Sequence, residues 1–269
     1  SCSNSATQRG GRPWRSPAFI LVPPNLCSGM AENVSVLYCP GLDGNAREME
    51  PVVELLPGHV RVEPFYYPTL PQVSFEELAR FIAIRLQERP RGRRLLAGCS
   101  FGGAVAQMVA LLQPGCLDGL FLVVTFNHEA EAFASMLGRA AVKVLPDFVL
   151  RPVTRALARW KLAGGLDEES NERFLKSITS VDPRLLAARL AMLKGFDVRA
   201  RLGEIKIPVD VVYSSDDPIS ASPAQLEGWK RLPEGRVSGV KGGHVAQRQA
   251  PEDIARLLLA WIERVTGAK

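Results

Sequence analysis

Residues 98–103 read Gly-Cys-Ser-Phe-Gly-Gly and lie between an apolar run, residues 95–97, and a helix-forming run, residues 104–112. A serine flanked by glycines two positions to either side, where a strand turns sharply into a helix, is the pattern of a nucleophile elbow. The serine backbone is strained at such a turn, and a Cβ at Gly98 or Gly102 would crowd it. The pattern therefore predicts that the Ser100 hydroxyl projects above the end of a sheet. A glycine-rich turn without chemistry can have the same sequence, so the rest of the chain must supply partners for this serine.

Strand and helix patterns alternate on both sides of this stretch. Strands are predicted at residues 34–39, 60–66, 94–98, 120–124, 209–213 and 236–240. The segments between the first four strands read as helices, the first over about residues 47–56 and the second opened by a capping box of Ser74 and Glu77. Residues 251–265 close the chain as an amphipathic helix. Such alternation predicts an α/β fold with a mostly parallel central sheet, helices on both faces, and ligands bound at the carboxyl ends of the strands.

One long interval interrupts the alternation. Residues 127–206 show no strand pattern and are predicted to form a helical cap, inserted into a core made of residues 30–126 and 207–269. Residues 1–29 combine Ser, Arg, Gly and Pro with one short apolar run. We expect them to form a poorly ordered leader or a peripheral extension, with an added edge strand at residues 18–22 as the alternative.

Composition narrows the class of protein. The chain has 269 residues, of which 46% are hydrophobic and 23% charged, as expected for one globular domain. No apolar run is long enough for a membrane span. The net charge is only +5 and the basic residues are not interleaved with aromatic residues, which argues against nucleic-acid binding. Five cysteines without a Cys-x-x-Cys pair favour reduced thiols and a cytoplasmic location. We find no metal-ligand cluster, dinucleotide fingerprint or phosphate loop, so neither a cofactor nor a metal is expected.

A serine hydroxyl needs an adjacent base, and at neutral pH this base is usually histidine. The chain has three histidines. His59 stands at the start of an early strand, at the sheet edge opposite the elbow, and is interpreted as a surface residue. His128 follows the strand after the elbow and is expected at the cap entrance, where substrate contact is its alternative role. His244 lies in a loop directly after the last strand, which opens at the same edge as Ser100, so we expect it to be the base.

The histidine in turn needs a carboxylate that fixes its tautomer and stabilises the imidazolium. Asp216 and Asp217 follow the strand at residues 209–213 and are both candidates. The order serine, aspartate, histidine is that of the α/β-hydrolases and differs from the orders of chymotrypsin and subtilisin. On these features the chain resembles the α/β-hydrolases over about residues 34–265.

This resemblance favours one of the two aspartates. Members of the family commonly carry a Gly-x-x-Asp-x-(Ile/Val) turn after the penultimate strand, with the catalytic aspartate third after the glycine. Here Ser214 stands at the glycine position, so the matching acid is Asp217. Asp216 is then expected to cap the turn or to be solvated.

The resemblance also implies an oxyanion hole. In the family one donor is the backbone N–H of the residue after the nucleophile, which is Phe101 here. The second comes from the turn after the first strand, where the matching N–H is that of Leu42 and Pro40 replaces the usual histidine. Asp43 in the same turn is interpreted as a turn residue, and Cys99 as a small side chain that fills space beneath the elbow.

The implied activity is that of a serine hydrolase that cleaves carboxylic esters of short to medium acyl chain through an acyl-enzyme. Thioesterase, lactonase and acyl-carrier methyl esterase activities are alternatives, and a non-catalytic ligand-binding homologue is an alternative of another class. Apolar cap residues at 136–149 are expected in the cap core or in an acyl pocket. Arg151, Arg155 and Arg159 are spaced four apart and form either a solvated face or a docking surface for an acidic acyl carrier.

Overall fold

The computed structural model describes residues 33–70, 73–89, 92–130, 151–152, 154–156, 158–159 and 164–267. By its contacts the chain divides into two units, Ser1–Glu32 and Asn33–Lys269. The expectations for residues 1–29, including the alternative edge strand, and for the apolar residues at 136–149 lie outside the described residues.

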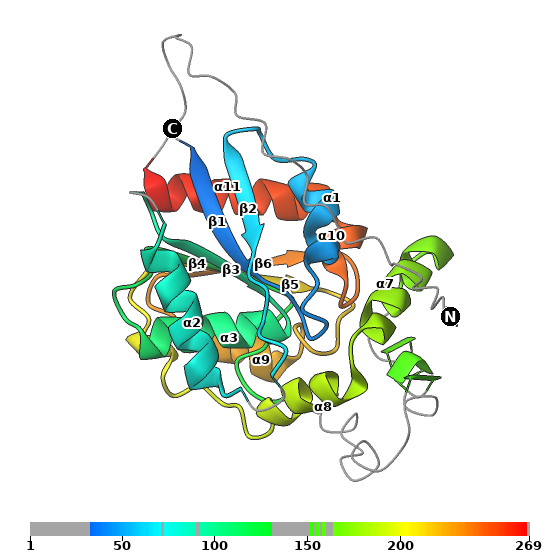
Figure 1. Cartoon of the computed structure of the whole chain (residues 1–269). Helices are drawn as coiled ribbons and strands as arrows, with labels where there is room; N and C mark the ends of the chain where they lie inside the picture. The colour runs from blue at the N-terminus through cyan, green and yellow to red at the C-terminus, as the bar shows by residue number, and fades with distance from the viewer. Residues whose placement is uncertain are drawn as a thin grey trace, which may run out of the picture. The chain divides into compact units, whose positions relative to one another are not determined.

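A six-stranded parallel sheet runs through the second unit (Figure 1). Its strands lie in the order β2-β1-β3-β4-β5-β6. They are β1 (Val34–Cys39), β2 (Val60–Pro64), β3 (Leu95–Cys99), β4 (Gly119–Val123), β5 (Val209–Ser214) and β6 (Gly235–Val240). Each strand of this order pairs in parallel with its neighbour, so the predicted α/β fold is confirmed and all strand carboxyl ends meet at one edge.

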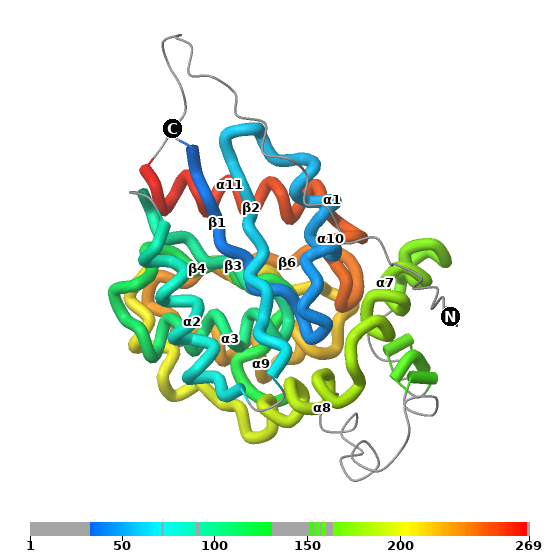
Figure 2. The backbone as a smooth tube through the Cα atoms, in the orientation of Figure 1, coloured from blue at the N-terminus to red at the C-terminus, as the bar shows by residue number. Residues whose placement is uncertain are grey.

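Helices cover both faces of the sheet, as Figure 2 also shows. Side chains alternate between the faces along each strand, so that Leu37 packs in one core and Val36 in the other. The first core includes residues of α2 (Phe75–Gln87), α3 (Phe101–Leu112) and α9 (Pro223–Trp229). The second includes residues of α1 (Glu50–Val53), α10 (Ala246–Gln249) and α11 (Pro251–Thr266).

Several helix boundaries follow from local sequence. Ser74 accepts from the Glu77 backbone N–H while the Glu77 carboxylate accepts from the Ser74 N–H, so the predicted capping box opens α2. The helix expected after β1 is shorter than the sequence pattern indicates, because it consists of a 3-10 turn, η1 (Ala46–Met49), followed by the single turn of α1. Pro51 lies at the start of α1, and proline has no N–H with which to continue the preceding turn.

The interval between β4 and β5 is helical where the structure describes it. It contains α7 (Glu168–Ser180), α8 (Pro183–Met192) and a short 3-10 turn, η2 (Leu202–Glu204). Asp167 caps α7 by accepting from the Ser170 N–H, and Asp182 caps α8 with Pro183 at its first position. These helices occupy the interval for which the sequence predicts the cap. Among the described helices, none is long and apolar enough to span a membrane.

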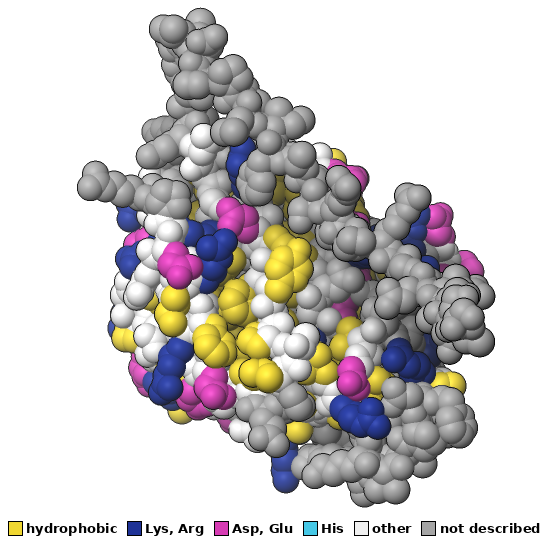
Figure 3. All heavy atoms as spheres, viewed as in Figure 1, with side chains coloured by type: hydrophobic (Ala, Val, Ile, Leu, Met, Phe, Trp, Pro, Cys, Tyr) yellow, Lys and Arg dark blue, Asp and Glu magenta, His cyan; other side chains and the backbone are white. Residues whose placement is uncertain are grey.

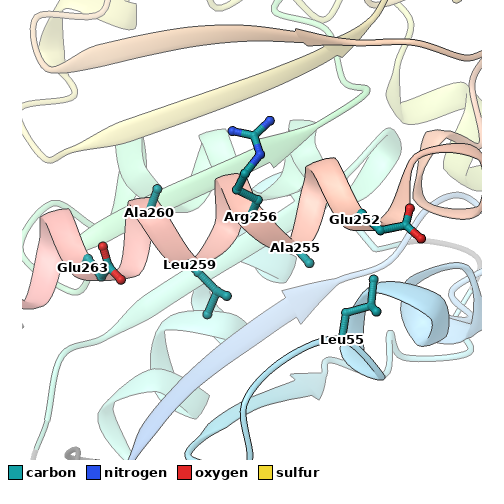
Figure 4. A pocket seen from close by; sticks show the side chains of 7 residues that line it. All are labelled: Leu55, Glu252, Ala255, Arg256, Leu259, Ala260 and Glu263. Atoms are coloured by element: carbon teal, nitrogen blue, oxygen red, sulfur yellow. The ribbon is translucent and has the colours of Figure 1, made fainter. Parts of the chain in front are cut away.

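The surface of the described residues has two features, a group of exposed hydrophobic side chains and a shallow pocket. Large hydrophobic side chains are exposed on α2 and on the segment after β2; they are Tyr66, Leu70, Phe81 and Ile84. Figure 3 shows hydrophobic side chains gathered on the face of the molecule where these elements lie. A shallow pocket lies between the turn after α1 and the outer side of α11 (Figure 4). Its lining contains aliphatic side chains and the charged groups of Glu252, Arg256 and Glu263.

Candidate active site

Ser100 lies between β3 and α3, at the carboxyl edge of the sheet. Its backbone has φ 51° and ψ −117°, a left-handed conformation that is unusual for a residue with a side chain. A Cβ at Gly98 would lie 2.5 Å from the carbonyl oxygen of Gly102, and a Cβ at Gly102 would lie 2.0 Å from that of Cys39. The crowding predicted at Gly98 and Gly102 is therefore confirmed. The sequence pattern missed Gly103, whose Cβ would lie 2.3 Å from the Thr125 hydroxyl oxygen.

The structure brings together the serine, histidine and aspartate that the sequence singled out. The Ser100 Oγ lies 2.9 Å from the His244 Nε2, and the His244 Nδ1 lies 3.0 Å from the Asp217 Oδ2. All three residues are buried, with exposed fractions of 5%, 8% and 1% for Ser100, His244 and Asp217. With its proton on Nδ1, the imidazole donates to Asp217 and can accept the serine proton on Nε2.

Asp217 and Asp216 lie in different surroundings. Asp216 is exposed and accepts a hydrogen bond from the Ser215 hydroxyl. The Asp217 carboxylate accepts from the backbone N–H groups of Ile219 and Ser220 at 3.1 Å each, and from the Ser220 hydroxyl at 2.6 Å. Burial alone would raise the pKa of Asp217, but the charge of His244 and these hydrogen bonds together lower it below its usual value. Ser220 thus orients the buried carboxylate, a contact that the sequence reasoning missed.

The loop that carries His244 is fixed from several sides. Ser214, at the position where the family has glycine, donates its hydroxyl proton to the Gly242 carbonyl. The same carbonyl accepts from the Asp216 N–H at 2.9 Å. The Gly243 N–H donates to the Gln249 side-chain oxygen at 2.6 Å. The serine at position 214 therefore connects the aspartate turn with the histidine loop, and Gln249 is a second residue that sequence reasoning missed.

Leu42 and Phe101 lie on two backbone segments in close contact. Leu42 is in the turn after β1, which the Gly44 N–H closes on the Gly41 carbonyl at 2.9 Å. Phe101 is the first residue of α3, so its N–H has no acceptor within the helix. The turn packs directly on this helix start, because a Cβ at Gly102 would lie 2.4 Å from the Pro40 carbonyl oxygen. Both predicted oxyanion donors therefore belong to the backbone next to Ser100.

Asp43 and Cys99 are both buried. Asp43 makes more contacts than its interpretation as a turn residue implies, because the Ser177 hydroxyl of α7 donates to its carboxylate at 2.5 Å. Burial raises the pKa of Asp43 despite this hydrogen bond. The Cys99 thiol accepts from the Gln247 amide at 2.7 Å, and burial raises its pKa to about 12. A thiol with so high a pKa stays protonated at neutral pH and fits the predicted space-filling role.

The other two histidines have different neighbours. The His59 carbonyl accepts from the Val34 N–H beside the amino end of β2, which is the sheet edge opposite the elbow. The His128 Nδ1 lies 2.8 Å from the Asn127 side-chain oxygen, and its backbone forms an isolated bridge with Asp197. Burial lowers the pKa of His128, and the nearby Arg199 lowers it further.

The three arginines singled out in the predicted cap contact α7. Arg155 lies 2.5 Å and 2.6 Å from the two carboxylate oxygens of Glu172, and Arg159 pairs with Glu168 at 3.8 Å. The Arg151 guanidinium donates to a backbone carbonyl of the same helix. Glu172 and Glu168 therefore offset much of the positive charge that the sequence indicates for these three arginines.

Comparisons with known proteins agree with this geometry. The model of the Alpha/beta hydrolase family matches residues 36–257. A pimeloyl-[acyl-carrier protein] methyl ester esterase of Yersinia pseudotuberculosis serotype O:1b (strain IP 31758) is 28% identical over 220 residues, which cover 77% of this chain and 81% of that protein.

Solved structures with the same fold include an esterase and an enol-lactonase. A thermophilic esterase from Thermogutta terrifontis has a TM-score of 0.70 at 21% identity, covering 87% of this chain and 91% of the other. An enol-lactonase from Burkholderia xenovorans LB400 has a TM-score of 0.69 at 17% identity, covering 86% and 92%. The chain belongs to the alpha/beta hydrolase family and is an esterase-like hydrolase.

Proposed function

We propose that this protein hydrolyses carboxylic esters of short to medium acyl chain through an acyl-enzyme on Ser100. The observation that carries the proposal is the buried chain of contacts from the Ser100 Oγ to His244 at 2.9 Å and from His244 to Asp217 at 3.0 Å. The three free, buried cysteines among the described residues are consistent with a cytoplasmic location, which we also propose.

The reaction begins when the Ser100 Oγ attacks the ester carbonyl carbon and its proton passes to the His244 Nε2. Asp217 stabilises the imidazolium that forms. The carbonyl oxygen becomes an oxyanion, which accepts hydrogen bonds from the Leu42 and Phe101 N–H groups. The amino end of α3 adds a partial positive charge at the same place.

The alcohol then leaves as the C–O bond breaks and takes the proton from His244. A water molecule attacks the acyl-enzyme carbonyl and gives its proton to the His244 Nε2. The second tetrahedral intermediate collapses, the proton returns to the Ser100 Oγ, and the carboxylic acid is released. Each step uses the contacts of the same three side chains and needs no further reactant besides water.

A series of p-nitrophenyl esters from acetate to palmitate tests this proposal. We expect the highest kcat/KM between two and about eight acyl carbons and a decline with longer chains, measured from p-nitrophenolate release. A fluorophosphonate probe should label the wild-type protein at Ser100. If no ester is turned over and no label is incorporated, the protein is not a serine esterase, and the ligand-binding alternative gains support. A thioester and a lactone in the same assay separate the thioesterase and lactonase alternatives.

The acyl-carrier methyl esterase in the comparisons favours a second candidate function, the hydrolysis of a carrier-bound methyl ester. Replacing Arg151, Arg155 and Arg159 together with alanine should then raise KM for that substrate about three- to tenfold and leave p-nitrophenyl butyrate hydrolysis unchanged. The expected effect is limited because Glu172 and Glu168 already pair with two of these arginines. A matched control is Arg173→Ala on α7, the helix that carries both glutamates, which should change the hydrolysis of neither substrate. Equal effects on both substrates would remove the docking idea.

A further inference from the structure

Three consecutive peptide groups in the turn after β1 have hydrogen-bonded carbonyl oxygens. The Tyr67 hydroxyl donates to the Pro40 carbonyl at 2.8 Å, and the Gly44 N–H donates to the Gly41 carbonyl at 2.9 Å. The Arg189 guanidinium donates to the Leu42 carbonyl at 2.5 Å. The middle peptide group contains the Leu42 N–H, which is one of the two proposed oxyanion donors.

These hydrogen bonds set the direction of the Leu42 N–H. In a trans peptide the N–H points opposite to the carbonyl of the same group, so the bond at the Gly41 carbonyl aims the Leu42 N–H away from the turn. The peptide groups before and after it are held at Pro40 and at Leu42. Within the described residues the Leu42 N–H itself has no acceptor. It is thus held in one orientation and left open to accept a ligand oxygen.

Arg189 is an unusual residue for this place. It comes from α8, is only 6% exposed, and its guanidinium lies over the Tyr67 ring at 5.1 Å from the ring centre. A Cβ at Gly44 would lie 3.0 Å from its Nη1, so the guanidinium packs directly on the turn. No carboxylate of the described residues lies within ion-pair distance of it, although Asp43 acts on it electrostatically. Burying a guanidinium on a neutral carbonyl costs free energy, so its position indicates a function at the turn.

The neighbouring helix α7 contacts the same turn at its other end. The Ser177 hydroxyl donates to the Asp43 carboxylate at 2.5 Å and accepts from the Asn45 side-chain amide at 3.1 Å. The Asn45 N–H donates to the same carboxylate at 3.2 Å. Two helices of the interval between β4 and β5 therefore hold the turn, α7 through Ser177 and α8 through Arg189.

Tyr67 connects this arrangement with the second proposed donor. Its ring packs edge-on against the ring of Phe101 with 5.6 Å between the ring centres, while its hydroxyl holds Pro40. Movement of Arg189 would therefore disturb the turn with Leu42 and the start of α3 with Phe101. These contacts connect α8 with the two backbone segments that carry the proposed donors.

We propose that Arg189 is a positioning residue that aligns the oxyanion hole from the cap, with Ser177 as its counterpart on α7. The proposal rests on the function proposed above. An oxyanion hole acts on the transition state and hardly on the bound substrate, so loss of alignment lowers kcat and leaves KM nearly unchanged. The same loss weakens transition-state analogues in proportion.

The test compares Arg189→Met, which keeps an unbranched stem but has no donor or charge, with Arg189→Lys and with the exposed control Arg173→Met. For p-nitrophenyl acetate we expect kcat of Arg189→Met to fall about 10- to 100-fold and KM to change less than about threefold. The inhibition constant of a trifluoromethyl ketone analogue should rise by the same factor as kcat falls. Arg189→Lys should recover part of the loss, and Arg173→Met should match the wild type.

Ser177→Ala is a milder second variant for the case that Arg189→Met does not fold, which thermal unfolding shows. We expect it to lower kcat about three- to tenfold at unchanged KM. An unchanged kcat in folded Arg189→Met, or in Ser177→Ala where Arg189→Met does not fold, overturns the proposal. A loss confined to KM also overturns it, because Arg189 would then bind substrate. Failure of the proposed function can be distinguished from failure of the Arg189 proposal. In the first case the wild-type protein itself neither hydrolyses the ester nor reacts with the fluorophosphonate.

Discussion

Replacing Ser100 with alanine should abolish ester turnover, with a fall in kcat of about 10⁶-fold and no fluorophosphonate labelling. The reason is that alanine lacks the hydroxyl that lies 2.9 Å from the His244 Nε2 and that attacks the ester in the proposed mechanism. Alanine and serine tolerate the left-handed backbone at φ 51° equally poorly, so the free energy of unfolding should change little. The loss is therefore expected to be chemical and not structural.

The measurement is p-nitrophenyl acetate hydrolysis at high enzyme concentration, with circular dichroism as the check on folding. His244→Ala should lose nearly as much, and the double variant should lose little more, because the two side chains act as one unit. Undiminished turnover by folded Ser100→Ala would mean that hydrolysis takes place elsewhere, and it would refute the mechanism.

The second large effect is expected at the carboxylate. Asp217→Asn should lower kcat about 10⁴-fold, whereas Asp216→Asn should change it less than about twofold. Asparagine at position 217 can present its amide group to the His244 Nδ1, 3.0 Å away, which favours the tautomer with its proton on Nε2. That tautomer cannot accept the serine proton. Asp216 is exposed, so its neutral replacement leaves the imidazole as it is.

The two variants should be assayed side by side at constant pH with the same ester. Ser220→Ala is a useful addition, because it removes one hydrogen bond at 2.6 Å and leaves the carboxylate in place. Its loss in kcat should lie between those of the two asparagine variants. A larger loss in Asp216→Asn than in Asp217→Asn would transfer the acid's role to Asp216.

The sheet and the elbow could be predicted from the sequence because their signals are local. Alternating apolar residues mark each strand, and glycines on both sides of Ser100 mark the turn. Asp217 and His244 could be found because strands that run in parallel end at one edge, so residues just after a strand come together in space. The structure places them within hydrogen-bond distance of one another, as that reasoning expects.

The supporting contacts could not be predicted in this way. Arg189 and Leu42 are 147 positions apart, and nothing near either residue in the sequence indicates that they meet. The same holds for Ser177 and Asp43, which lie 134 positions apart. The helix after β1 was predicted too long, because its apolar pattern continues to Leu56 whereas the helix ends at Val53. Contacts between distant segments, and the exact ends of short helices, cannot be predicted from the periodicity of apolar residues.

The three glycines of the elbow differ in how they constrain sequence change. At Gly98 and Gly102 an added methyl group would meet main-chain atoms, which every amino acid carries, so no substitution elsewhere can make room. At Gly103 it would meet the side chain of Thr125, including its Cβ at 2.5 Å, so only glycine at position 125 would make room. We therefore expect no side chain to be tolerated at position 98 or 102, in natural homologues or in designed libraries. Positions 103 and 125 are coupled, because a side chain at 103 is tolerated only after glycine has replaced Thr125.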